Sequence, residues 1–291
     1  MVAGRAASLD LGNRALTLDG GDEIGYEQLV VATGAVADRD RVPGSRDHAL
    51  FPCDLADATS FATRISDGAA AVAIVFGWER PGPGLEYAAW IGAHRPGVRV
   101  TAIDGDGTMG RRFGAKATAW IRALLERRGG QLLTEGTVSR ISEGTVELEG
   151  RSVEADLIAV VAPLRGCTDW LPPSLLDGHG RLRTDAALAA GPGVFGIGDV
   201  VAVPDGYRLS PALRSIQATA AGVARNVAGA LRGVAPQDVL KPGQPDMLGP
   251  DLAGTAILVR DRRMVLRGRL PLFIRSAGER RYLRSRSAQG A

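Results

Sequence analysis

The middle of the chain repeats one arrangement, in which a short apolar run is followed by an amphipathic stretch. The apolar runs predict strands at Ala71–Phe76, Val98–Ile103 and Gln131–Thr134, and the stretches between them predict helices at Leu85–His94 and Ala115–Arg128. Runs with few polar positions are typical of strands that are buried on both faces. Because strands that alternate with helices form parallel β-α-β units, this part of the chain is predicted to be α/β.

Buried strands are also predicted on either side of this repeat. Gln28–Ala32 is an apolar, β-branched run that stops at Thr33-Gly34, and Val194–Ile197 is a second run that stops at Gly198. A long helix is predicted near Pro211–Leu231. Glycine permits a close approach of the backbone to a ligand, so both strand ends are candidate binding positions.

The last part of the chain predicts a separate small module. A Pro- and Gly-rich linker, Gly233–Gly249, precedes two strand candidates, Thr255–Arg260 and Met264–Arg267, and a basic helix near Leu272–Arg284. The 291-residue chain has a net charge of +3, but ten arginines lie between Arg260 and the C-terminus. The basic character therefore belongs to the terminal module and not to the main body.

The basic helix allows two interpretations. It mixes arginines with leucine, isoleucine and aromatic residues, a composition that suits the surface of a membrane with anionic headgroups. The alternative is a solvated helix that packs on its own domain. Nucleic-acid binding is not predicted, because the chain has neither an interleaved aromatic surface nor a recognisable motif.

Several classes of protein are excluded by what the sequence lacks. No apolar run approaches the ~20 residues that a bilayer-spanning helix needs, and the first residues lack the apolar core of a secretory signal, so a cytoplasmic location is predicted. His48, His94, His179 and the two cysteines, Cys53 and Cys167, have no metal-ligand spacing, and no metal site is predicted. Hydrolase and NTPase motifs are absent as well.

The most specific feature is the pair of glycine-ended strands. Asp199 follows Gly198 at the carboxyl end of a strand, where open α/β sheets bind their ligands. A carboxylate there can accept hydrogen bonds from sugar-like hydroxyls, and the start of the following helix can face a phosphate. The alternative is that both segments are ordinary buried strands that end in glycine.

These segments resemble the two-dinucleotide-binding flavoproteins, the pyridine nucleotide–disulfide oxidoreductases in the broad sense. The resemblance implies that Asp199, with Gly198, holds the ribityl chain of FAD. It also implies that Ala32, Thr33 and Gly34 lie beside the flavin and that Gln217 lies on the helix that passes the isoalloxazine.

The resemblance implies an α/β flavoprotein fold, in which a Rossmann-like insert interrupts an FAD domain and a small α+β module follows. We predict FAD-domain parts at residues 1–66 and 166–240, the insert at 67–165 and the terminal module at 241–291. Family members open with a strand, a G-x-G-x-x-G turn and a helix. No segment before Tyr26 has that form, so the FAD domain is expected to lack this opening part.

The insert is the candidate site for a second nucleotide. Gly77 and Gly84 can serve as the first and last glycines of a dinucleotide fingerprint, although the spacing is longer than in G-x-G-x-x-G. Asp104 ends the second strand, where an acidic side chain would bond the ribose of NAD and repel the phosphate of NADP. Glu86 matches a helix-borne glutamate of NADH dehydrogenases in the superfamily. The sequence leaves NAD, NADP and neither open.

A literal G-x-G-x-x-G also occurs, at Gly105–Gly110. It follows the second strand of the unit instead of the first, and we expect the helix to begin several residues after Gly110. We therefore interpret it as a coincidental match.

The proline-rich turn, Pro81-Gly82-Pro83-Gly84, resembles the sulfide:quinone reductase branch, whose members do not use NAD. In that branch a cysteine persulfide attacks the flavin. Here neither the turn nor the terminal module contains a cysteine, so sulfide chemistry of that type is not favoured.

The sequence thus supports two kinds of function. The first is an FAD-dependent oxidoreductase that passes hydride from NAD(P)H through the flavin to a small-molecule acceptor, for which quinone is a candidate, with peripheral contact to the inner face of a membrane through the basic helix. The alternatives are a sulfide:quinone reductase-like flavoprotein, or a truncated or non-catalytic homologue that needs a partner or further N-terminal residues. No residue is predicted to be catalytic.

Overall fold

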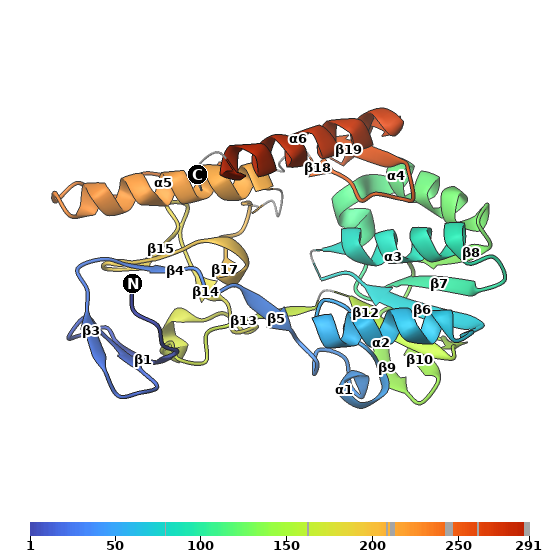
Figure 1. Ribbon diagram of the computed structural model, residues 1–291, viewed down its shortest axis with the longest axis horizontal. Helices are drawn as coiled ribbons and strands as arrows, with labels where there is room; N and C mark the ends of the chain where they lie inside the picture. The colour runs from blue at the N-terminus through green and yellow to red at the C-terminus, as the bar shows by residue number, and fades with distance from the viewer. Residues whose placement is uncertain are drawn as a thin grey trace. The chain divides into compact units, whose positions relative to one another are not determined.

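The computed structural model describes residues 1–78, 80–161, 163–207, 209, 213–241, 247–260 and 262–287. These form two compact units, each with its own buried core (Figure 1). The first unit contains Met1–Val36 and Arg165–Pro245, and the second contains Ala37–Leu164 and Asp246–Ala291. Among the described helices, none combines the length and the hydropathy needed to span a bilayer.

A four-stranded parallel sheet forms the centre of the second unit. Its strands are β6 (Ala71–Phe76), β7 (Arg99–Asp104), β8 (Gly130–Leu133) and β12 (Leu157–Val161), in the order β12-β6-β7-β8. The predicted parallel α/β architecture is therefore confirmed. Because the direction of strand order reverses between β6 and β12, the carboxyl ends of these two strands define the edge at which such sheets bind ligands.

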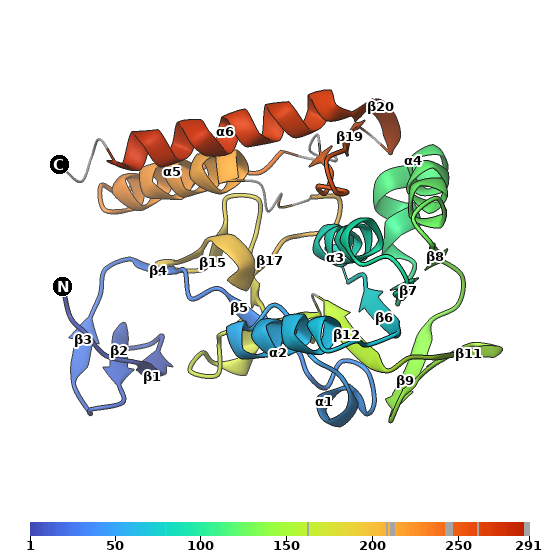
Figure 2. The same ribbon diagram turned by 45° about the vertical axis from the view of Figure 1, so that its right-hand side comes forward.

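Both faces of this sheet are covered, as the apolar strands predicted. Ile74 belongs to the core that faces the helices, whereas its neighbour Val75 belongs to the core on the other face, because successive strand residues point in opposite directions. Figures 1 and 2 show α3 and α4 side by side on the first face, with the β9–β11 meander on the other. The covering elements are α2 (Leu55–Ser66), α3 (Pro81–His94) and α4 (Thr108–Glu126) on the first face, and α1 (Ser45–His48), β9 (Val138–Ser142), β10 (Thr145–Leu148) and β11 (Arg151–Glu154) on the second.

The start of α4 differs from the prediction. The helix begins at Thr108, inside the G-x-G-x-x-G match, and not several residues after Gly110. Gly107 has a left-handed backbone that turns the chain into the helix, and the carboxylate of Asp104 accepts the first helical N–H groups. Gly114, at φ +75°, interrupts the helix, so only its second part coincides with the predicted segment.

The terminal module packs within the second unit. It contains an antiparallel sheet in the order β18 (Met247–Leu248), β19 (Ala256–Arg260) and β20 (Arg263–Gly268), followed by α6 (Arg269–Ser287). Leu252, Ile257 and Val259 are 0–2% exposed and belong to the same core as α3 and α4. The module is therefore part of the core of this unit, although the linker pattern suggested a separate domain.

The first unit is assembled from segments that lie far apart in the sequence. It contains an antiparallel sheet of β1 (Ala6–Asp10), β2 (Ala15–Leu18) and β3 (Glu23–Gly25). Its remaining elements are β4 (Leu29–Val31), η1 (Pro173–Leu175), β14 (Leu182–Arg183), β15 (Ala189–Gly191), β16 (Val194–Gly196), η2 (Gly198–Val200), β17 (Val201–Ala202) and α5 (Leu213–Ala230). Pro211, the predicted start of α5, lies outside the described residues.

The compact units and the predicted domains have different boundaries. Residues 37–66, which the sequence analysis assigned to the FAD domain, belong to the second unit, because Phe61 and Ile65 of α2 are buried in its core. The chain passes between the units along β5 (Ala35–Ala37) and β13 (Leu164–Gly166), which pair with each other. The cofactor assigned to each domain stays a prediction.

Candidate functional site

The two glycine-ended segments of the first unit lie on neighbouring strands. β4 pairs with β16 in parallel, with Val31 opposite Gly196. The N–H of Ile197 continues the ladder by donating to the carbonyl oxygen of Val31 at 3.0 Å. Since both strands run in the same direction, the segments that follow them leave the sheet at the same edge. The structure thus places Ala32–Gly34 and Gly198-Asp199 at one strand edge.

Hydrogen bonds hold the first of these segments in place. The hydroxyl of Thr33 donates to the carbonyl oxygen of Cys167 at 2.8 Å, and the N–H of Cys167 donates to the carbonyl oxygen of Gly34 at 3.1 Å. Sequence reasoning considered Cys167 as a candidate metal ligand and missed this contact. The signal was weak, because the backbone of Cys167 makes the bonds and not its thiol.

The second segment combines an open backbone with a carboxylate. Gly198 has φ +78°, and a Cβ atom added to it would meet no atom within 4 Å. This is a position where a ligand can approach the chain closely. Asp199 follows in the short helix η2. Gln217 lies on a different element, α5, with its side chain exposed.

The carboxyl edge of the second unit gathers two carboxylates against a glycine turn. Gly77 follows β6 at φ +140°, and a Cβ atom there would lie 2.5 Å from Oδ1 of Asp106 and 3.2 Å from Oδ1 of Asp104. The N–H of Trp78 donates to Oδ1 of Asp106 at 3.1 Å. Glycine at position 77 therefore lets the turn after β6 approach the acidic loop after β7.

Asp104 is a structural carboxylate at this edge. It is 1% exposed, and its oxygens accept the N–H groups of Thr108 at 3.1 Å and Met109 at 2.9 Å. Its pKa is raised from 3.8 to about 6, mainly by burial and also by the nearby charge of Asp106, while the N–H groups of Met109 and Thr108 act in the opposite direction. Its predicted bond to a ribose is untested, and its position is that of a cap on α4.

Asp106 is the more accessible carboxylate, and sequence reasoning missed it. Its side chain is 27% exposed, and Oδ2 accepts the hydroxyl of Thr108 at 2.8 Å and Nη2 of Arg111 at 3.3 Å. The signal that could have found Asp106 was its place inside the Gly105–Gly110 match, which the sequence analysis set aside. The match lies at the carboxyl edge of the parallel sheet, because it follows the end of β7.

The start of α3 offers a close packing surface but few donors. A Cβ atom at Gly84 would lie 2.4 Å from Cβ of Phe76, so glycine there permits close contact between helix and strand. Pro81 and Pro83 have no backbone N–H. Among the first four residues of the helix, Gly82 and Gly84 therefore supply the only N–H groups for an anion.

Glu86, predicted to contact a nucleotide, is bound by the terminal module. Its Oε1 accepts Nη1 of Arg275 at 2.5 Å and the N–H of Asp251 at 2.8 Å. Burial by itself lowers the pKa of Arg275, but the hydrogen bonds and charges of Glu86 and Glu279 raise it above its ordinary value. The predicted nucleotide contact of Glu86 is untested.

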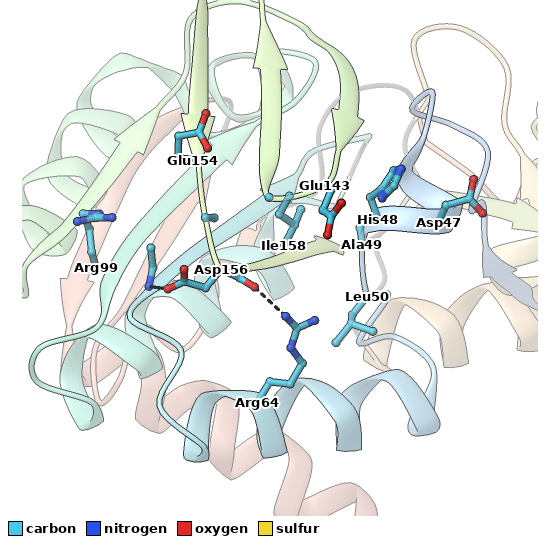
Figure 3. Close-up of a pocket in the computed structure, with 13 residues that line it drawn as sticks. Asp47, His48, Ala49, Leu50, Arg64, Arg99, Glu143, Glu154, Asp156 and Ile158 are labelled. Atoms are coloured by element: carbon cyan, nitrogen blue, oxygen red, sulfur yellow. Dashed lines mark hydrogen bonds between the residues drawn. The ribbon is translucent and has the colours of Figure 1, made fainter.

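A separate polar depression lies at the opposite edge of the parallel sheet (Figure 3). It has a volume of about 780 Å³ and lies at the amino ends of β6, β7 and β12. Arg64 of α2 points toward Asp156 and donates to its backbone oxygen at 2.7 Å, while the carboxylate of Asp156 accepts the N–H groups of Ala70 and Ala71. Its charged side chains are exposed and of both signs, so this depression has no clear preference for a ligand of either charge.

Within the described part of the chain, no group of three or more His, Cys, Asp or Glu side chains is arranged to hold a metal ion.

Comparison with known proteins identifies the family. The family model described as pyridine nucleotide-disulphide oxidoreductase matches residues 1–224. The chain belongs to the pyridine nucleotide-disulphide oxidoreductase family. This agrees with the resemblance carried by the two glycine-ended segments.

Two curated relatives of this oxidoreductase family member are named as NAD(+) reductases. The ferredoxin–NAD(+) reductase component of the biphenyl dioxygenase system of Paraburkholderia xenovorans is 30% identical over 208 residues, which cover 69% of this chain and 50% of the relative. The nitric oxide reductase FlRd-NAD(+) reductase of Pectobacterium atrosepticum is 27% identical over 218 residues, which cover 72% of this chain and 55% of the relative. The chain thus spans about half the length of these relatives.

Solved structures with the same fold are flavoprotein oxidoreductases. The sulfide:quinone oxidoreductase of Aquifex aeolicus has a TM-score of 0.76 at 18% identity, with 97% of this chain and 74% of that chain covered. The water-forming NADH oxidase of Lactobacillus brevis, bound to NADH, has a TM-score of 0.61 at 20% identity, with 87% and 57% covered. At these identities the likeness establishes the two-dinucleotide-domain flavoprotein fold.

Members of the family use FAD and NAD(H). The described residues fit both groups. In the first unit, the open backbone at Gly198 and the carboxylate of Asp199 suit a flavin's polyhydroxyl chain. In the second unit, the turn at Gly77 and the partly exposed Asp106 suit a ribose diol.

Proposed function

We propose that this protein is an FAD-dependent oxidoreductase that takes hydride from a nicotinamide nucleotide and passes electrons to an acceptor. The single observation that supports this most is the parallel pairing of β4 with β16, which brings Gly34 and Asp199 to one strand edge. FAD, when bound, would supply the redox chemistry, and the protein's part is to bind and orient the reacting groups.

The residues of the first unit would hold the flavin. Asp199 would accept hydrogen bonds from the ribityl hydroxyls, and Gly198 would let the chain approach them. The bonds between Thr33, Gly34 and Cys167 would keep the neighbouring segment fixed. Because this arrangement is held in advance, little conformational freedom would be lost on binding.

The second unit would bind the hydride donor, and the charge at its edge favours NADH over NADPH. Asp106 is partly exposed beside the turn at Gly77. A carboxylate in this position can accept hydrogen bonds from a ribose diol, and it repels a 2′-phosphate. Arg111 donates to Asp106 and compensates part of its negative charge, and the remaining part would repel the phosphate.

The terminal module supports a quinone acceptor delivered at a membrane. Leu270, Phe273 and Ile274 lie at the spacing of one helix face on α6 and are 57%, 64% and 43% exposed. Exposed arginines lie close by in the sequence, at Arg267 and Arg269. Such a surface matches an anionic leaflet, where apolar side chains enter the interface and arginines face headgroups. We place the protein on the cytoplasmic side of that membrane.

The test of the proposal is direct. The purified chain is titrated with FAD, and bound flavin is measured by its visible spectrum after free FAD is removed. NADH is then added without oxygen, and loss of the oxidised flavin band is followed. Stoichiometric FAD and bleaching by NADH are expected. A chain that folds but binds no FAD would contradict the proposal and favour a homologue that needs a partner or further residues.

A further inference from the structure

The terminal module contacts both helices that border the nucleotide edge. Leu252 and Ile257 of the module are fully buried in the core that also contains Leu85 of α3 and Phe113 of α4. Apolar burial of this kind fixes the module on the two helices. Any displacement of the module would open the core beneath α3.

Backbone contacts make this fit specific. A Cβ atom at Gly114, in the kink of α4, would lie 2.2 Å from the carbonyl oxygen of Arg262, so the turn after β19 packs against bare backbone. The guanidinium of Arg128 donates to the carbonyl oxygens of Leu252 at 2.9 Å and Ala253 at 3.2 Å. These carbonyls belong to the loop that leads into β19.

A charged contact reaches the first turns of α3. Oε1 of Glu86 accepts Nη1 of Arg275 at 2.5 Å and the N–H of Asp251 at 2.8 Å, and both side chains of the ion pair are about one-third exposed. Arg275 is oriented in turn by Oε1 of Glu279, one helical turn further along α6, at 3.1 Å. The same carboxylate oxygen of Glu86 therefore receives two donors from the module.

We propose that Glu86 is a positioning residue, which the terminal module holds through Arg275 and Asp251 so that the start of α3 is fixed for nucleotide binding. This inference rests on the proposed function, because it assigns a role at the edge that would bind the hydride donor. In this role Glu86 contacts other residues of the protein and does not contact the nucleotide.

The start of α3 has a particular need for such support. Pro81 and Pro83 remove two of its first four N–H groups, so any bond from the helix to a phosphate depends on Gly82 and Gly84. Because only these two N–H groups are available, phosphate binding is sensitive to small movements of the helix. Glu86 lies about one helical turn beyond Gly82. A contact that fixes the side chain of Glu86 therefore also limits the movement of the N–H groups of Gly82 and Gly84.

The experiment compares Glu86→Gln, Arg275→Met and the double variant with the wild-type protein. Arg280→Met is the matched control, because Arg280 is exposed on the same helix. Hydrogen exchange of the peptide that covers α3 is measured without nucleotide. The dissociation constant for NADH is measured on the same FAD-loaded proteins, together with kcat and KM.

Faster exchange in α3 is expected for Glu86→Gln and Arg275→Met, and unchanged exchange for Arg280→Met. Both single variants should weaken NADH binding and raise KM by roughly three- to tenfold, with kcat unchanged. The double variant should be no worse than either single variant, because both remove the same contact. Bound FAD should remain unchanged.

Two results would overturn the inference. The first is unchanged exchange of α3 in Arg275→Met. The second is weaker NADH binding in Glu86→Gln with unchanged binding in Arg275→Met, because that pattern would mean direct contact between Glu86 and the nucleotide. If FAD binds but NADH binds to no variant, the proposed donor fails, and the exchange comparison by itself still decides the positioning role.

Discussion

Val31 of β4 and Gly196 of β16 lie opposite each other in neighbouring parallel strands, although the segment Ala37–Leu164 of the second unit separates them in the sequence. Parallel neighbours can only be joined by a long connection, and here that connection includes an α/β sheet with its helices. The pair therefore places the segments after both strands at one edge. This relationship makes Asp199 the first residue to test.

Asp199→Ala should weaken FAD binding by roughly 10- to 100-fold, because a carboxylate that accepts hydrogen bonds from hydroxyls contributes ~1.5–3 kcal/mol. The flavin content after gel filtration and an FAD titration measure this change. Asp205→Ala is the control, because Asp205 is exposed in the loop that follows β17. Equal flavin content in both variants would remove Asp199 from the proposed site.

Asp106→Asn should weaken NADH binding by about tenfold and weaken NADPH binding less, so the preference for NADH should fall. The substitution weakens the hydrogen bonds that residue 106 makes to the ribose diol of NADH. It also removes the negative charge that repels the 2′-phosphate of NADPH. Binding of both nucleotides is measured by titration. Asp67→Asn, at the exposed end of α2, should change neither affinity. An unchanged ratio of the two affinities in Asp106→Asn would contradict the proposed preference.

Gly114→Ala should destabilise the protein by ~2–4 kcal/mol, because φ is +75° and the new Cβ would collide with the carbonyl oxygen of Arg262. Chemical denaturation measures the free energy of unfolding. Gly110→Ala is the matched control on the same helix, where a Cβ atom would meet nothing within 4 Å. That change should be neutral or stabilise by up to ~1 kcal/mol. Similar effects of the two substitutions would mean that the module does not pack against the kink.

Asp104 should make the free energy of unfolding depend on pH. Its pKa is about 6 in the folded protein and 3.8 in the reference state, so the folded protein binds the proton more tightly. Its contribution to stability is fully present below pH 3.8 and is lost as the pH rises through about 6, by at most ~3 kcal/mol. Unfolding of the wild type and Asp104→Asn is compared from acidic to neutral pH. A difference between them that stays constant across this window would contradict the raised pKa.

Phe273→Asp should lower binding to vesicles that contain anionic lipid by tenfold or more, because it removes an exposed ring that would enter the membrane interface and adds a charge of the wrong sign. Co-sedimentation measures the bound fraction. Leu55→Asp is the control, because Leu55 is 85% exposed at the start of α2, where an acidic residue is tolerated. Equal binding by the two variants would exclude α6 as the membrane surface.

Local patterns were enough to predict most of the secondary structure. The run Ala71–Phe76 is a strand with the predicted bounds, and α3 extends to the predicted His94. The first residues of α3 and α4 were placed wrongly, because Pro81 and Thr108 begin helices through contacts and turns that a periodic pattern does not contain. The start of α4 shows this most clearly. The carboxylate of Asp104 accepts the N–H groups of Thr108 and Met109, and these bonds form only once β7 and α4 are in place.

The sequence by itself determined the family, the parallel α/β core and the two glycine-ended strands, because each depends on residues that are neighbours along the chain. Tertiary structure alone decided which carboxylate at the carboxyl edge of the parallel sheet is buried and which is partly exposed, since Asp104 and Asp106 are only two positions apart. It also decided that the terminal module shares a core with α3 and that Arg275 meets Glu86. Such contacts arise from burial of apolar surface between distant segments, and no local pattern encodes the partner that a side chain will meet.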